Sequence, residues 1–324
     1  MIRRFLCQNL VPIVLAGGGV AFFGYQSPAF LTFGNFVNIL IQSSSMAIAA
    51  IGMTFVLLTA GIDLSIGSIM FLSAVIAGKM VLSGYALPWV LAAALITGLA
   101  CGGVNAWLIT RMGLIPFIVT LAAQYIGRGL GLWISQTRAM NLPGGLVRVG
   151  TARIAGLPVP VLIFLLVLAG AYIVLERTPF GRRIYAAGYD LDVAQKAGID
   201  TRAVLFSVYL ICGALAALSG IVSVAQLGAV SPKFGEQREF AAISAAVLGG
   251  TSLFGGRGHV FPGTVLGAVL IQTVENGLVI MNADPYLYPL ITSAIIFLAV
   301  MMDSLRHHRL TQMKRKKIRV ESGG

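Results

Sequence analysis

Charged side chains are scarce in this sequence. Asp, Glu, Lys and Arg make up 10% of the 324 residues, whereas hydrophobic residues make up 57%. From Phe5 through Ile62 there is no Asp, Glu, Lys, Arg or His, although about 20 apolar residues are enough to cross a bilayer once. The mean hydropathy is +0.90, more than a soluble domain of this length needs to fill its core. The sequence therefore predicts an integral membrane protein.

Motifs for catalysis and nucleotide binding are also missing. The chain has no Gly-x-x-x-x-Gly-Lys-Ser/Thr loop, no His-Glu-x-x-His and no Gly-x-Ser-x-Gly. Its three cysteines, Cys7, Cys101 and Cys212, are too far apart to suggest a disulfide framework or a metal site. We therefore expect no enzyme activity, bound metal or cofactor in this chain. Energy for any transport must come from an ion gradient or from a separate ATPase.

Apolar runs bounded by turn residues and charges predict an all-α polytopic fold in a single domain, residues 1–324. Small residues are abundant within these runs, as is typical where helices approach closely in lipid. Ten spans are expected, centred on residues 10–26, 36–60, 66–83, 88–110, 114–135, 159–176, 203–226, 239–254, 261–281 and 286–303. An even number of spans places both termini on one side of the membrane.

The distribution of basic residues indicates which side that is. Of the 23 Lys and Arg residues, 16 fall on the side of the termini, and seven of these belong to the basic tail at 304–324. Cytoplasmic segments carry such an excess, so we expect both termini in the cytoplasm. We therefore expect the basic residues behind the net charge of +12 to contact anionic lipid and not nucleic acid. The longest outer connection, 136–158, is either a docking surface for an external partner or a linker.

A polar segment on the same side, Arg177–Arg202, has eight charged residues in 26 positions; we call it the island. Asp190 is placed to cap a short helix, and Gly198 suits the left-handed backbone conformation that ends such a helix. Asp192 and Lys196 are spaced for attraction at i and i+4. This pattern predicts one two-turn helix. Because so short a helix is marginal alone in water, we expect a partner protein to hold it.

Polar residues recur at helical spacing within two apolar spans. Asn38, Gln42 and Ser45 fall on one face of the second span, and Thr120, Gln124 and Arg128 share a face of the fifth. Such stripes either line a hydrophilic path or join helices to one another.

Two acidic residues near or within apolar runs also have alternative interpretations. Asp63 lies where two runs meet, between Gly61 and Gly67, and either caps the following helix or contacts substrate. Glu275, beside Asn276, is either a proton site or a hydrogen-bonded structural group; a single acid is a thin basis for proton coupling, which favours the second interpretation.

Several segments together resemble the permease subunits of bacterial ABC importers for ribose, xylose, galactose and related sugars. The most specific are Gly61-Ile62-Asp63-Leu64-Ser65-Ile66-Gly67 and Val247-Leu248-Gly249-Gly250-Thr251-Ser252-Leu253-Phe254-Gly255-Gly256-Arg257-Gly258. Similar segments occur at 47–54, 116–121, 181–188, 197–199 and 218–221, in the family's order. One departure is Glu275, where the family commonly has Asn or another neutral residue.

The resemblance implies inward movement of a monosaccharide across the bacterial cytoplasmic (inner) membrane by alternating access. It implies two cytoplasmic ATPases, which hold ATP and Mg²⁺, a periplasmic or lipid-anchored sugar-binding protein, and a second permease copy or paralogue. Family members offer a coupling helix to the ATPase, and the positions carried over are Gly188, Asp190, Asp192, Lys196 and Gly198. We expect Asp63, Ser65, Phe117 and Asn276 to join the two stripes in the substrate pathway. Alternative substrates are nucleosides, branched-chain amino acids or a signalling furanone, and an ion-coupled secondary transporter is a rival class.

Overall fold

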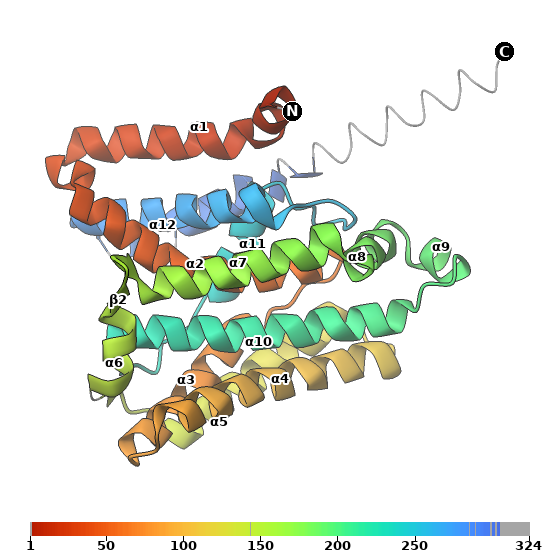
Figure 1. Cartoon of the computed structure of the whole chain (residues 1–324), viewed down its shortest axis with the longest axis horizontal. Coiled ribbons are helices and arrows are strands. Elements are labelled where there is room, and N and C mark those ends of the chain that lie inside the picture. Colours follow the sequence, from red (N-terminus) through yellow and green to blue (C-terminus); the bar gives the residue numbers. More distant parts are fainter. Residues whose placement is uncertain are drawn as a thin grey trace.

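The computed structural model describes residues 2–142, 144–284, 286–288, 290–298, 300–301 and 303–304. The chain is almost entirely helical (Figure 1). The helices are α1 (Ile2–Gln26), η1 (Pro28–Leu31), α2 (Phe33–Leu58), α3 (Ile66–Leu82), α4 (Leu87–Arg111), α5 (Pro116–Ser135), α6 (Gly144–Thr151), α7 (Val159–Arg177), α8 (Pro179–Tyr189), α9 (Leu191–Lys196), α10 (Thr201–Leu227), α11 (Arg238–Leu248), η2 (Val260–Thr264) and α12 (Val265–Ile280). Two antiparallel pairs of two-residue strands join β1 (Met140–Asn141) to β4 (Ala229–Val230) and β2 (Arg153–Ile154) to β3 (Leu157–Pro158).

The predicted all-α membrane fold is confirmed in its main feature. Among the described residues, six helices are long and apolar enough to cross a membrane: α2, α4, α5, α7, α10, and η2 continued by α12. Two shorter apolar helices, Ile13–Gln26 and Ile66–Leu82, match the first and third predicted spans. The described residues of the tenth predicted span are helical from residue 287 on. The basic tail lies outside the described residues from position 305 on.

Two predictions, one about a span and one about the island, need correction. The span predicted at 239–254 is wrong, because α11 ends at Leu248 after 11 residues, and the Gly249-Gly250 turn follows. The island contains two helices, α8 and α9, and not one. The connection 136–158, predicted as a docking surface or a linker, contains α6 and three of the short strands.

The central helix of the molecule is α2, which is buried from Met46 through Thr59. It packs against α7, α10, α11 and α12, while α4 and α5 pack against α3, and α10 also packs closely on α4. In Figure 1, α8 and α9 lie at one end of the helices and α6 and β2 at the other. We call the end that carries α8 and α9 the island face, and the opposite end, with α6 and β2, the α6 face.

Candidate transport path and coupling surface

The chain between α2 and α3 leaves the helical conformation inside the packed core. Asp63 in this break is fully buried, and its Oδ1 accepts hydrogen bonds from the backbone amide of Ser65 at 2.9 Å and from the Ser65 hydroxyl at 2.6 Å. Asp63 thus closes the turn that leads into α3, but it does not cap the helix itself, because Ser65 is the N-cap residue and no side chain caps α3 there. The same Ser65 hydroxyl accepts a hydrogen bond from the side-chain amide of Asn105 on α4 at 2.9 Å. Ser65 and the Oδ1 of Asp63 hold the break, whereas the buried Oδ2 of Asp63 has no hydrogen-bond partner among the described residues.

The polar stripe on α5 extends from this break to α11. Thr120 donates to the carbonyl of Ile62 at 3.2 Å, and Gln124 Nε2 donates to Glu239 Oε1 at 2.6 Å. Arg128 donates to the carbonyl of Phe234 at 2.6 Å and lies 4.6 Å from the centre of the Phe71 ring, a cation–π distance. The hydrogen bonds of this stripe therefore join α5 to the break, to α11 and to the segment that precedes α11.

The polar stripe on α2 has a different neighbour. Gln272 on α12 donates from Nε2 to Gln42 Oε1 at 2.9 Å, and Ser219 on α10 donates to the carbonyl of Ser45 at 2.6 Å. Asn38, nearer the start of α2, is exposed. The side chain of Gln42 thus contributes to helix association, whereas the Ser45 hydroxyl donates to the carbonyl of Gln42 within its own helix.

Among the described residues, no hydrogen bond joins the α2 stripe directly to the α5 stripe. Instead, the α5 stripe bonds to α11 through Glu239 and the α2 stripe bonds to α12 through Gln272, and α11 packs against α12. Buried Asn276 lies on α12 one residue from Glu275, whereas Phe117 is 49% exposed at the start of α5. The short helix α11 and its neighbour α12 thus link the two stripes.

Glu239 is a functional candidate that the sequence interpretation missed. It is buried in the first turn of α11, where negative charge is favourable. Its Oε1 binds Gln124, but Oε2 has no hydrogen-bond partner within the described part of the chain. A buried acid with a free acceptor is unusual in a membrane domain. The signal available in the sequence was weak, because Glu239 directly follows Arg238 at the start of the predicted span 239–254 and reads as part of the polar connection before it.

Glu275 is paired with a neighbouring arginine. Its Oε2 lies 3.6 Å from Nη1 of Arg238, with side-chain exposures of 25% and 37%. This pair supports the structural interpretation of Glu275, and it provides a physical reason for an acid at a position where a neutral residue is common. Because both groups are partly exposed, the pair is worth little to stability.

The island forms the capped helix that its sequence predicts. Asp190 Oδ1 accepts hydrogen bonds from the backbone amides of Asp192 and Val193, each at 3.0 Å, at the start of α9. Gly198 follows the helix with a φ of +82°, the left-handed conformation that favours glycine. The predicted attraction between Asp192 and Lys196 does not form a contact within 4.0 Å: the two ion pairs recorded for the described residues involve other groups.

Helix α8 connects α9 to the membrane core at one close backbone contact. Gly188 lies so near the end of α2 that a Cβ at this position would overlap the carbonyl oxygen of Leu58. The same carbonyl accepts a hydrogen bond from the backbone amide of Gly256 at 2.9 Å. We call this meeting of α8, the end of α2 and the loop 251–258 the junction. Leu58 lies five residues before Asp63, so the junction is close in sequence to the break between α2 and α3.

Side chains reinforce the junction. The Tyr185 hydroxyl on α8 donates to the carbonyl of Gly258 at 2.9 Å. Burial, followed by the charge of Glu176, raises the pKa of Tyr185, so the hydroxyl stays protonated and able to donate. On the other side of the loop, Asp303 accepts a hydrogen bond from the backbone amide of Leu253 at 2.9 Å. The loop 251–258 is therefore held by α8 and by the C-terminal helical segment together.

These features define a multi-pass membrane transport protein: a broken helix in a packed core, polar side chains across apolar helices, and a folded polar surface on one face. The family described as branched-chain amino acid transport system / permease component matches residues 35–302. The D-allose transport system permease protein AlsC of Escherichia coli (strain K12) is 38% identical over 290 residues, covering 88% of each chain. The ribose import permease protein RbsC of Bacillus subtilis (strain 168) is 37% identical over 280 residues, covering 86% of this chain and 87% of the relative. The galactofuranose transporter permease protein YtfT of Escherichia coli (strain K12) is 34% identical over 277 residues, covering 85% of this chain and 81% of the relative.

The chain belongs to this permease family, whose members named above are sugar permeases of ABC importers. It is a multi-pass transport subunit of the bacterial cytoplasmic membrane and not an enzyme. The resemblance derived from its motifs is confirmed. No solved structure gives a significant match to this chain.

Proposed function

We propose that this permease moves a monosaccharide inward by alternating access and that an ATPase drives it through the island. The observation that carries the proposal is the junction, where Gly188 on α8 abuts the carbonyl of Leu58 at the end of α2. A permease without a nucleotide loop is driven only through a surface that touches its motor. The island provides such a surface, and the junction links it to the broken helix in the core.

Sugar is the substrate class that the relatives and the polar groups support. The named relatives carry D-allose, ribose and galactofuranose in their names. A neutral sugar is bound by hydrogen-bond donors and acceptors with little net charge. Gln124, Arg128 and Glu239 provide such groups near the broken helix, and the partnerless Oε2 of Glu239 is an acceptor for a sugar hydroxyl. We assign these residues, with Gln42, Asn276 and the neighbouring polar groups, to the path.

Alternating access then requires two arrangements of the helices that line the path. ATP binding on the partner is expected to push α9 and α8, and the junction passes this displacement to the end of α2 and to the loop before α12. Since α11 is hydrogen-bonded to one stripe and α12 to the other, a shift of this pair changes the surroundings of both stripes. Gly188, Asp190, Asp192, Lys196 and Gly198 are the coupling residues in this account.

The remaining partners follow from the two faces. In the orientation that we propose, the island face is cytoplasmic and receives the ATPase. The α6 face is external and receives a sugar-binding protein, and a second permease copy or paralogue completes the path. The start of α1 lies toward the island face (Figure 1), and Asp303 binds the loop 251–258, which supports both termini on the cytoplasmic side.

The experiment that tests this function is uptake into proteoliposomes that contain the permease, its ATPase and a binding protein. Labelled D-ribose, D-allose and D-xylose are offered singly, with L-leucine as the competing substrate class. We expect ATP-dependent accumulation of at least one sugar, no competition by leucine, and no effect of a protonophore. Accumulation that requires a proton gradient but no ATP would contradict the proposal.

A further inference from the structure

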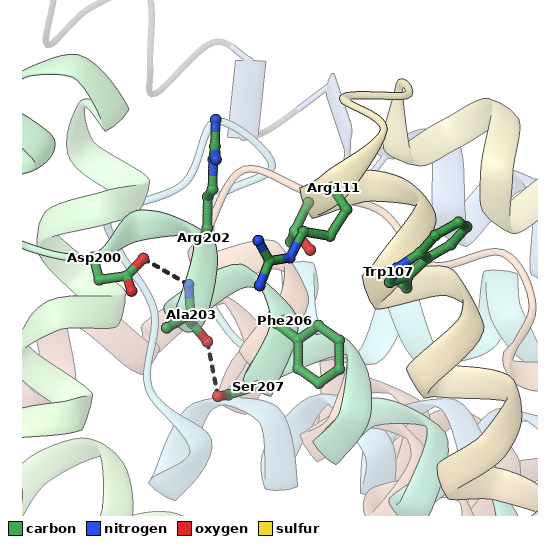
Figure 2. Close-up of a pocket in the computed structure, with 8 residues that line it drawn as sticks. Trp107, Arg111, Asp200, Arg202, Ala203, Phe206 and Ser207 are labelled. Atoms are coloured by element: carbon green, nitrogen blue, oxygen red, sulfur yellow. Dashed lines mark hydrogen bonds between the residues drawn. The ribbon is translucent and has the colours of Figure 1, made fainter.

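A second polar site lies apart from the path, between the ends of α4 and α10 on the island face. It is a cavity of about 850 Å³ that is lined by Trp107, Thr110, Arg111, Asp200, Arg202, Ala203, Phe206 and Ser207. Figure 2 shows the guanidinium group of Arg111 beside the ring of Phe206, with Trp107 on one side and Arg202 extending from the start of α10. The proposed transport cycle gives these residues no role.

Three of the six polar side chains that line this cavity are already engaged. Asp200 Oδ1 accepts from the backbone amide of Ala203 at 3.0 Å, which caps α10. The Ser207 and Thr110 hydroxyls each donate to a carbonyl of their own helix, at 2.8 Å to Ala203 and at 2.7 Å to Ala106. For Arg111 and Arg202, in contrast, no side-chain hydrogen bond or ion pair is recorded among the described residues.

Apart from the second carboxylate oxygen of Asp200, the side-chain groups that remain available can only donate. A guanidinium group has five N–H donors and no acceptor, and the indole of Trp107 has one donor. The complement of such a site is an anion with several acceptor oxygens. A phosphate group fits because arginine binds it with two parallel hydrogen bonds. The negative charge of Asp200 leaves the cavity with a net charge of +1, which matches a phosphodiester better than a doubly charged phosphate.

The surroundings point to lipid as the source of that phosphate. Arg111 is the last residue of α4, so the cavity opens where this membrane-spanning helix reaches the polar interface. Below it, α4 exposes Val104, Leu99 and Ile96, an apolar surface on which acyl chains can lie. Trp107 is 52% exposed between the two regions, and tryptophan favours the headgroup level of a bilayer.

We propose that this cavity binds the phosphodiester headgroup of an anionic phospholipid, with Arg111 and Arg202 as its ligands. Because α10 follows α9 after only a short turn, the bound lipid is adjacent to the coupling helix. Basic pockets between transmembrane helices are known to suit such headgroups. The proposal does not depend on which sugar is carried or on how ATP hydrolysis is coupled.

The test is native mass spectrometry of the purified full-length permease in detergent, titrated with dioleoyl phosphatidylglycerol or dioleoyl phosphatidylcholine. We expect one phosphatidylglycerol per chain, bound at least about tenfold more tightly than phosphatidylcholine. The variant Arg111→Gln/Arg202→Gln should lose this preference, since charge-assisted hydrogen bonds are removed. The matched control is Arg182→Gln/Arg183→Gln, which removes the same charge from exposed positions on α8.

Several outcomes overturn the proposal. An equal loss in the control variant would mean that general surface charge attracts the lipid, and an unchanged preference in the cavity variant would place the lipid elsewhere. Displacement of phosphatidylglycerol by equimolar sodium phosphate would identify a soluble anion as the ligand. If the Arg111→Gln/Arg202→Gln variant retains the lipid but no longer co-purifies with the ATPase, the two arginines bind the ATPase and not the lipid. If the double variant melts below the control, the single variants Arg111→Gln and Arg202→Gln are compared in its place, with the same expected direction.

Discussion

Gly188 on α8 lies directly against the carbonyl oxygen of Leu58, at the point where α2 ends. There is no room for a side chain between the island and the core helix. This contact and the hydrogen bond from Gly256 to the same carbonyl make the end of α2 a shared support for two segments that are far apart in sequence.

Replacing Gly188 by alanine should therefore separate α8 from α2. We expect the junction to be destabilised by about 1–3 kcal/mol, the usual cost of overpacking a close contact. ATP-dependent uptake should fall steeply, because α9 no longer moves with the broken helix. The matched control is Gly170→Ala on α7, where a Cβ would meet nothing within 4 Å. Equal uptake by both variants would show that the junction transmits nothing.

Gln124→Leu tests the path on α5. The substitution removes the donor to Glu239 Oε1 and leaves a buried carboxylate without its partner. We expect a stability loss of about 1–3 kcal/mol and reduced uptake, with assembly of the ATPase intact. Uptake at the level of the unaltered permease, with normal expression, would assign the stripe to helix packing.

A double-mutant cycle tests whether Gln124 and Glu239 interact in the folded permease. The unaltered permease, Gln124→Leu, Glu239→Gln and the double variant are compared by thermal unfolding. We expect the effects to be non-additive, because the two side chains contact each other. Additive effects would mean that the contact is not formed in the membrane.

Glu275→Gln distinguishes the structural role of this acid from a proton site. Its partner Arg238 is more than a third exposed, so loss of the pair should change stability by no more than about 1 kcal/mol. ATP-dependent uptake should be nearly unchanged and remain insensitive to protonophore. A loss of uptake in a variant that melts normally would reopen the ion-coupled alternative.

The sequence was sufficient to predict features that depend on local signals. Asp190 and Gly198 flank a short polar segment, and both play the structural roles expected of them in α9. Long apolar runs likewise predict the main spans, since burial in lipid and helix formation are decided within one segment. The helix α8 was not predicted, although Thr178 followed by Pro179 is a recognisable helix start, and the Thr178 side chain does cap Gly181.

The remainder of the site depends on contacts between distant segments. Gln124 and Glu239 are 115 positions apart, and Gln42 and Gln272 are 230 apart, so periodicity alone identifies polar faces but not their partners. The short length of α11 was overlooked because the residues after Leu248 carry no charge before Arg257, although Gly249-Gly250 marks a turn. The cavity at α4 and α10 has no local sequence motif, because its two arginines come from different helices.

The central claim is that the island couples ATP hydrolysis to sugar movement, and Gly198→Val tests it most directly. Valine at a φ of +82° strains the end of α9 by about 1–3 kcal/mol, and no neighbouring atom lies within 4 Å to add a clash. Gly84→Val is a closely matched control, with a φ of +80° and equally open surroundings in the turn between α3 and α4.

The measurement is sugar-stimulated ATP hydrolysis in proteoliposomes with the ATPase and binding protein present, using whichever of D-ribose, D-allose or D-xylose the unaltered permease accumulates. The account predicts that Gly198→Val abolishes most of the stimulation and uptake, as should Asp192→Lys, which sets a like charge four residues before Lys196. Gly84→Val should retain both. Normal stimulated hydrolysis and uptake in both island variants would contradict the account and show that the island does not couple ATP hydrolysis to transport.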